Sequence, residues 1–145
     1  MRRRPAARFL ALIAAVAAMA AGCGPTANAE LKRRIQALHA TAVEARLLAD
    51  GVIGNRTKAT FARVHARVLA ESAQHEAEKM ADAKIAPGLE TDREKAVAIA
   101  QRLSDAIGVL VVFPGRENAA RELADELRVL ADEAQRLDES IPEKP

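Results

Sequence analysis

The sequence predicts an all-α fold, arranged as an up-down-up-down four-helix bundle. Alanine and long charged residues are abundant, which is the composition of helices. Four stretches between residues 28 and 141 repeat apolar residues at steps of three and four, and short gaps with glycine or proline separate them. Short gaps make consecutive helices antiparallel, so a bundle buries the four stripes best. The alternative is a helical hairpin pair that dimerises through the fourth helix.

The first helix is expected over residues 28–50. Asn28 is a candidate N-cap, and Glu30 would lie in the first turn, where an acid is favoured. Its apolar stripe consists of Leu31, Ile35, Leu38, Ala42 and Ala45. The segment from Gly51 to Gly54 would end the helix, because glycine adopts the left-handed cap conformation at little cost.

The second helix is expected over residues 56–85, with Asn55 or Thr57 as its N-cap. Pro87 and Gly88 would stop it. Its predicted buried stripe consists of Phe61, Val64, Val68, Leu69, Ala73, Ala77 and Met80. The second half of that stripe is rich in alanine and therefore thin.

The third helix is expected to begin at Thr91, which together with Glu94 has the spacing of a capping box. Its stripe consists of Ala96, Ile99, Ala100, Leu103, Ile107 and Leu110, and Pro114 with Gly115 would end it. The run from Val109 to Phe113 covers more than one helix face. Any part of that run left exposed would be the best candidate for a contact with a partner or a membrane.

The fourth helix, residues 116–140, has the clearest pattern. Its apolar residues form an a/d seam of Ala120, Leu123, Leu127, Leu130, Ala134, Leu137 and Ile141. Acids and bases fill the other positions. The last four residues, 142–145, would be a disordered tail.

Residues 1–22 have the order of an export signal. Arg2, Arg3, Arg4 and Arg8 give a basic start without an acid, and an apolar run from Phe9 to Ala21 follows. That run is too short for a stable membrane-spanning helix, which needs about 20 apolar residues. A cleaved signal peptide therefore fits the segment better than a permanent anchor does.

The residues Ala20-Ala21-Gly22-Cys23 resemble the lipobox of bacterial lipoproteins, although that family prefers leucine where this chain has Ala20. The resemblance implies that Cys23 receives a diacylglycerol and becomes the acylated first residue of the mature chain. Residues 23–29 would then form the lipid-attachment cysteine and a flexible tether, and residues 30–141 the helical bundle. The resemblance covers only the leader.

Ordinary signal peptidase offers a competing cleavage site. Ala27-Asn28-Ala29 before Glu30 has the small-x-small pattern, and cleavage there would discard Cys23 and release a soluble product. Cys23 is the only cysteine, and an exported domain with one unpaired thiol would be unusual. This favours lipid attachment, and the resulting location is the cell envelope, on a bacterial membrane and facing the periplasm or the exterior.

The composition argues against nucleic-acid binding. All 20 acids follow residue 22, whereas four of the 22 basic residues precede it, so the mature chain would carry a net charge of −2. The high sequence pI is thus a property of the leader. After cleavage the aromatic residues are Phe61 and Phe113 alone, too few for a base-stacking platform.

Three histidines are the candidate nitrogen ligands for a metal. In an antiparallel hairpin that turns near Gly54, Glu44 lies level with His65, and His39 lies level with the region of Glu71. Glu71 and His75 also share one helix face. A metal site formed by His39, His65, Glu71 and His75 is therefore a hypothesis, although the spacing is not the Glu-x-x-His of di-iron bundles.

No serine–histidine–acid arrangement and no phosphate-binding glycine loop can be found in the sequence, and no cofactor is expected. The sequence therefore favours a membrane-tethered binding or structural module over an enzyme, with an envelope protein as its partner through helix faces. The alternative is a soluble periplasmic bundle that binds a metal or a small ligand.

Overall fold

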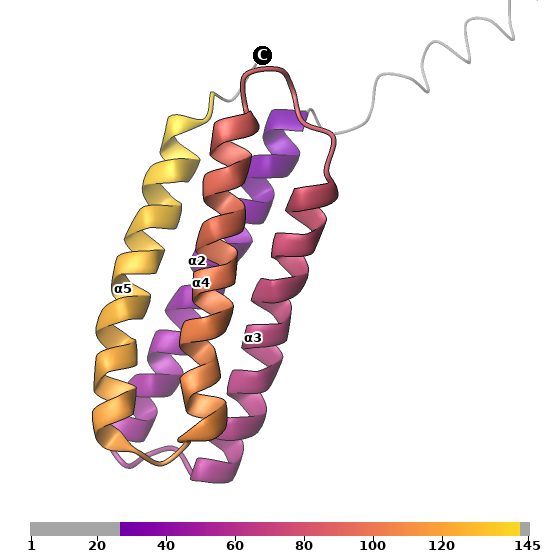
Figure 1. Cartoon of the computed structure of the whole chain (residues 1–145). Helices are drawn as coiled ribbons and strands as arrows, with labels where there is room; N and C mark the ends of the chain where they lie inside the picture. The colour runs from indigo at the N-terminus through magenta and orange to yellow at the C-terminus, as the bar shows by residue number, and fades with distance from the viewer. Residues whose placement is uncertain (1–26, 143–145) are drawn as a thin grey trace, which may run out of the picture.

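The computed structural model describes residues 27–142, which fold into four antiparallel helices (Figure 1). The helices are α2 (Ala27–Ile53), α3 (Ala59–Asp82), α4 (Glu90–Val112) and α5 (Glu117–Ser140), and the described residues include no strand. The predicted all-α bundle is thus confirmed. The signal peptide at 1–22, Cys23 and most of the predicted tether and tail lie outside the described residues.

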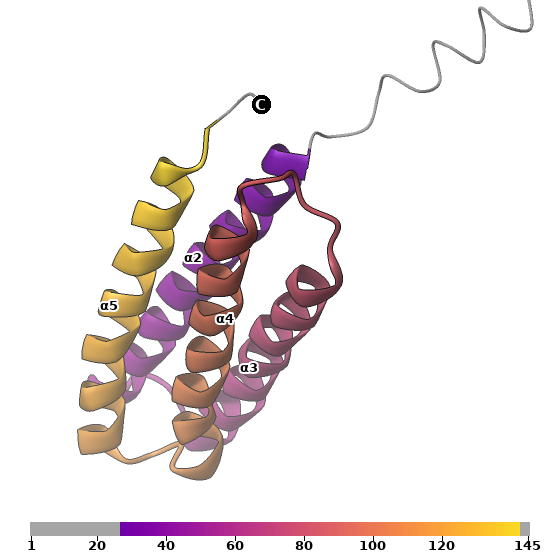
Figure 2. The ribbon, with the colours of Figure 1, turned by 45° about the horizontal axis from the view of Figure 1, so that its top comes forward.

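The connections between helices define two ends of the bundle. The start of α2 lies beside the end of α5 and the α3–α4 connection, and this is called the proximal end (Figures 1 and 2). The α2–α3 and α4–α5 connections lie together at the opposite end, called the distal end. The chain therefore enters and leaves the bundle at the proximal end.

The bundle consists of two closely packed helix pairs. α3 packs mainly against α4, and α2 packs mainly against α5, whereas the contacts of α2 with α3 and of α4 with α5 are fewer. Alanine side chains are small, and helices that contact each other through small side chains can have their axes close together. The fully buried alanines of α3 and α4 are Ala62, Ala66, Ala73, Ala96 and Ala100. Those of α2 and α5 include Ala42, Ala45, Ala49, Ala120 and Ala134.

Larger side chains fill the space between the two pairs. The largest fully buried ones are Ile35, Leu38, Met80, Leu103, Ile107, Leu110, Leu127, Leu130 and Ile141. Every residue of the predicted a/d seam of α5 is buried, as is the predicted stripe of α2. These two stripes were therefore predicted correctly.

The predicted stripe of α3 is wrong in its first half. Phe61, Val64 and Val68 are 60%, 58% and 55% exposed, and Ala62 and Ala66 are fully buried instead. The close packing of α3 on α4 explains the difference, because the interface admits small side chains where the prediction placed large ones. From Leu69 to Met80 the predicted stripe is buried.

The predicted helix starts need correction. α2 begins at Ala27, so its first three residues are helical and Asn28 is not an N-cap. Asn28 is only 4% exposed, and its Nδ2 donates a hydrogen bond to the carbonyl of Pro142 at 3.4 Å. α3 begins later than predicted, with Lys58 at the N-cap in place of Asn55 or Thr57.

The capping box predicted at Thr91 is not formed. α4 begins at Glu90, and Leu89 occupies the N-cap without a side-chain hydrogen bond. Leu89 is buried, so core packing rather than capping sets this helix start. The Glu90 carboxylate accepts a hydrogen bond from the backbone N–H of Gly88 at 2.8 Å.

The α2–α3 connection folds back on the last turn of α2. Gly51 remains helical, and its carbonyl accepts hydrogen bonds from the backbone N–H groups of Arg56 and Thr57 at 2.8 and 3.0 Å. Asn55, and not a glycine as predicted, adopts the left-handed conformation here, with φ 51°. A Cβ on Gly51 would lie 2.2 Å from Oγ1 of Thr57. Gly51 is therefore required for close approach.

We expect Gly51→Ala to destabilise the bundle by about 1–3 kcal/mol, the usual range for overpacking. The Cβ of Thr57 itself would lie 3.3 Å from the added Cβ, so rotation of the Thr57 side chain relieves only part of the clash. Gly108→Ala is the matched control, because a Cβ there meets nothing within 4 Å. That variant should gain up to about 1 kcal/mol from helix propensity. Chemical denaturation measures both, and equal effects would contradict the close-approach argument.

Candidate functional site

A network of charged side chains joins the start of α2 to the end of α3 at the proximal end. Arg34, whose side chain is 15% exposed, pairs with Glu30 at 2.6 Å and with Glu76 of α3 at 2.9 Å. Glu30 also accepts two hydrogen bonds from Arg33. The hydrogen bond from Arg33, helped by the nearby charge of Arg34, lowers the pKa of Glu30 below its ordinary value of 4.5.

A second polar contact joins the start of α2 to the end of α5. Lys32 Nζ donates hydrogen bonds to the carbonyls of Asp138 and Ile141 at 2.9 and 3.2 Å. A cation is favourable there because the last carbonyls of a helix lack partners and carry partial negative charge. Gln36 donates to the carboxylate of Asp138, and Asn28 reaches the carbonyl of Pro142. The first turns of α2 are therefore fixed to both neighbouring helices.

The structure does not bring the four predicted metal-site residues together, although Glu71 and His75 share one face of α3 as predicted. His65 Nε2 lies 2.9 Å from Oε1 of Glu44. The two residues therefore lie at the same height along the α2–α3 hairpin, as predicted. His75 pairs with Glu78 of its own helix at 3.8 Å, and with Glu71 it lines a hollow between α3 and α4. His39 lies on the α5 side of α2, since Gln36, one turn earlier, contacts α5. Within residues 27–142 no three histidine, cysteine or acidic side chains are grouped as metal ligands.

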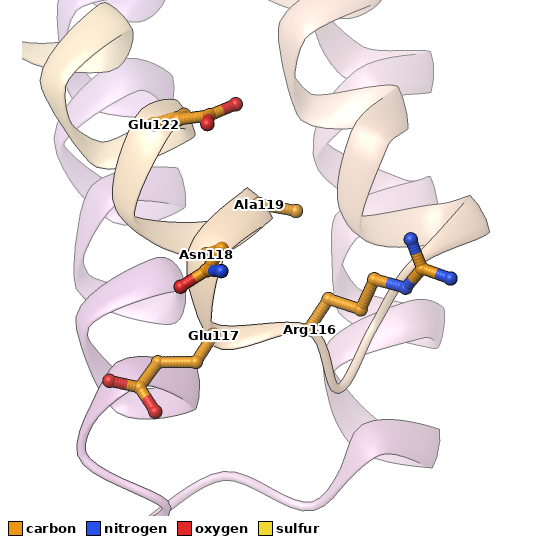
Figure 3. A pocket seen from close by; sticks show the side chains of 5 residues that line it. All are labelled: Arg116, Glu117, Asn118, Ala119 and Glu122. Carbon is orange, nitrogen blue, oxygen red and sulfur yellow. The ribbon is translucent and has the colours of Figure 1, made fainter.

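A shallow hollow of about 420 Å³ lies at the start of α5 (Figure 3). Arg116 and Glu117 extend in opposite directions from it, and Asn118 and Glu122 do not meet them (Figure 3). The Arg116 guanidinium lies over the ring of Phe113 at 4.6 Å, and Glu117 pairs with Arg121. Because the charged groups do not converge, the hollow lacks the arrangement of a ligand or catalytic site.

Exposed large apolar residues form the more informative surface. The α3 patch consists of Phe61, Val64 and Val68, and the α4 patch consists of Val109, Val112 and Phe113, which are 37%, 64% and 41% exposed. Both patches lie in the distal halves of their helices. The α4 run was predicted to be a candidate contact if any part of it is exposed, and that condition is met. The α3 patch was not predicted, because its residues were expected in the core.

The two patches occupy opposite faces of the bundle. Phe61 stacks on His65 with ring centroids 5.4 Å apart, and His65 contacts Glu44, so this patch borders α2. Val109 lies two turns after Arg102, which pairs with Glu133 of α5 at 2.7 Å, so the α4 patch borders α5. Each patch is therefore accessible to a different partner.

Comparison with models of known protein families, with curated proteins and with solved structures finds no match. Among the helices of residues 27–142, none combines the length and the hydrophobicity required to cross a bilayer.

The lowered pKa of Glu30 predicts a pH-dependent contribution to stability. An acid with a depressed folded-state pKa stabilises the fold above its unfolded pKa, and this contribution is lost as pH falls through the folded pKa. Glu30→Gln should therefore lower the melting temperature at pH 7, and the difference from the parent protein should shrink below about pH 4.5. Thermal melts between pH 3 and pH 7 test this. Glu126→Gln, at an exposed site, is the control and should show no such gap.

Proposed function

We propose that the protein is a membrane-tethered envelope lipoprotein that acts as a helical binding or structural module and not as an enzyme. The observation that carries the proposal is the distribution of its surface. The chain enters the bundle at the proximal end, where polar contacts fix α2, whereas two patches of exposed apolar side chains lie toward the distal end. This arrangement suits a module that is held at one end and makes contacts with the other.

The start of α2 supports lipid attachment at Cys23 over ordinary cleavage before Glu30. Cleavage between Ala29 and Glu30 would cut within α2 and remove its first three residues. One of them, Asn28, is buried and bonded to Pro142. Cleavage before Cys23 would leave the helix and this contact intact, and would leave only a short tether between the lipid and the bundle.

The α4 patch is the surface that we propose for an envelope protein partner. Val109, Val112 and Phe113 lie close together in sequence, are exposed and border α5. Water contacts this apolar surface in the isolated chain, and burial against a partner would remove about 25 cal/mol of unfavourable free energy per Å². A helix with a matching apolar stripe is the expected counterpart.

Intact mass spectrometry of the protein from its native membrane fraction tests the tether. We expect a chain that begins at Cys23 and carries acyl groups. Cys23→Ser should move the protein out of the membrane fraction. A mass that begins at Glu30 without lipid would contradict the proposal and make the protein a soluble exported bundle.

Val112→Asp tests the partner surface. Val112 is 64% exposed, so an aspartate should change the melting temperature little while placing a charge in the apolar contact. We expect envelope proteins that copurify with the parent protein to be lost. Val129→Asp is the matched control, because Val129 is 47% exposed on α5 outside both patches. Identical copurifying proteins from parent and Val112→Asp would refute the surface.

A further inference from the structure

The charged side chains in and just before the first half of α3 are all positive. Residues 51–70 contain no acid, and their four cations are Arg56, Lys58, Arg63 and Arg67. All four are exposed, and none forms an ion pair with any acid of the described residues. Elsewhere along residues 27–142 most cations lie near acids, as in the pairs of Arg102, Arg121 and Arg128. The positive charge of this segment is therefore not neutralised within the bundle.

The same segment exposes the α3 patch. Ala62 and Ala66 occupy the buried side of these turns, which leaves Phe61, Val64 and Val68 in solvent. Arg67 lies on the α4 side, where it lines a hollow with Ser104 and Val111. Phe61 lies on the α2 side, next to His65. Cations thus border one edge of the face, and apolar side chains occupy its middle and other edge.

We propose that this face, the first half of α3 with Arg56 and Lys58, rests on an anionic phospholipid surface. Apolar side chains beside cations are the composition of helices that lie in a bilayer interface, where the cations attract acidic lipid head groups. None of the hollows identified on the described residues is lined by the three apolar side chains. Two of the cations, Arg63 and Arg67, lie one turn apart on α3, and the other two lie at its N-cap and in the preceding loop. A face whose cations are spread along the chain and do not line a hollow fits an extended lipid surface better than it fits a single small anion.

This inference rests on the proposed tether, which brings the face to the lipid. An anchored chain holds the bundle at a high effective concentration near the membrane, so a weak second contact is sufficient. The diacylglycerol proposed at Cys23 carries two acyl chains and anchors the protein by itself, so the basic face would set the orientation of the bundle and not its attachment.

The contact determines how the bundle lies on the membrane. α2 has 27 residues and is about 40 Å long, and the basic face is at its far end from the tether. The bundle must therefore incline until the first half of α3 reaches the lipid. Beyond that half, Glu71 and Glu78 face solvent on α3 and limit the contact. On α2, Glu44 is engaged by His65, and Asp50 near the end of the helix is half-buried and forms no ion pair with the described residues.

A tryptophan introduced in place of Val64 can report the contact, because the chain has no native tryptophan. We would add vesicles to the full chain as purified from cells, carrying Val64→Trp. The vesicles would be phosphatidylcholine alone or mixed with phosphatidylglycerol. We expect a blue-shifted emission and quenching by brominated lipid in the anionic vesicles only, both suppressed by high salt. Val129→Trp on α5 should show neither.

Charge reversal supplies the second arm. Arg63→Glu with Arg67→Glu, introduced into the Val64→Trp chain, should weaken the contact of the face with anionic vesicles, measured by tryptophan emission, at least about tenfold, since each cation near such a surface contributes about fivefold. The matched control is Arg128→Glu with Arg136→Glu, which changes the net charge equally on α5. Circular dichroism and thermal melts verify that both variants fold.

Three results would overturn the inference. An equal loss of the contact with anionic vesicles in both double variants would mean that only the net charge of the protein matters. A blue shift of the Val64→Trp variant that occurs without lipid and grows with protein concentration would mean that a second copy of the chain covers the face. Unchanged emission of that variant in anionic vesicles would mean that the face does not touch lipid. The mass of the mature chain decides the tether separately, so failure of the lipid contact is distinguishable from failure of the proposed function.

Discussion

Close packing of alanine-lined helix faces determines most of the structure. α3 lies close to α4 and buries Ala62, Ala66 and Ala73, and α2, which lies close to α5, also buries alanines. Such small side chains allow a close approach of helices. Once small side chains occupy the interface of α3, its large apolar residues have no room there. The exposed α3 patch is therefore a consequence of how the two pairs pack, and the surface chemistry of the molecule follows from its core.

How far the sequence predicts this structure depends on how sharply each helix separates its apolar positions from its charged ones. α5 alternates leucine with charge so strictly that only one face can be buried, and every seam residue from Ala120 to Ile141 is buried. In α3, alanine and the larger apolar residues both recur at helical spacing, so two neighbouring faces compete. Sequence periodicity favours the face with Phe61 and Val64, whereas the partner helix selects the face with alanines. Knowledge of the α3–α4 approach was needed to decide between them.

Helix ends and candidate sites were less predictable for a related reason. Thr91 and Asn28 have the side chains of N-caps, yet burial of Leu89 and a contact between Asn28 and Pro142 move the helix starts by one or two residues. The α2–α3 hairpin alone predicts that Glu44 and His65 lie at the same height along the bundle, and the structure confirms this. The rotation of each helix does not follow from it, so His39 and Glu71 lie level without facing each other.

The two ends of the bundle differ in what stabilises them, and this difference is the basis for assigning them different roles. At the proximal end, Lys32 neutralises the carbonyl end of α5 and Arg34 joins α2 to α3, so a pull on the start of α2 is distributed over three helices. At the distal end, the cations near α3 form no ion pair with the described residues, and large apolar side chains are exposed on α3 and α4 and, at Leu47, on α2. If one face lies on lipid, the α4 patch on the other face remains in solvent. A bundle inclined on a membrane would thus keep one apolar surface for the bilayer and present the second to a protein.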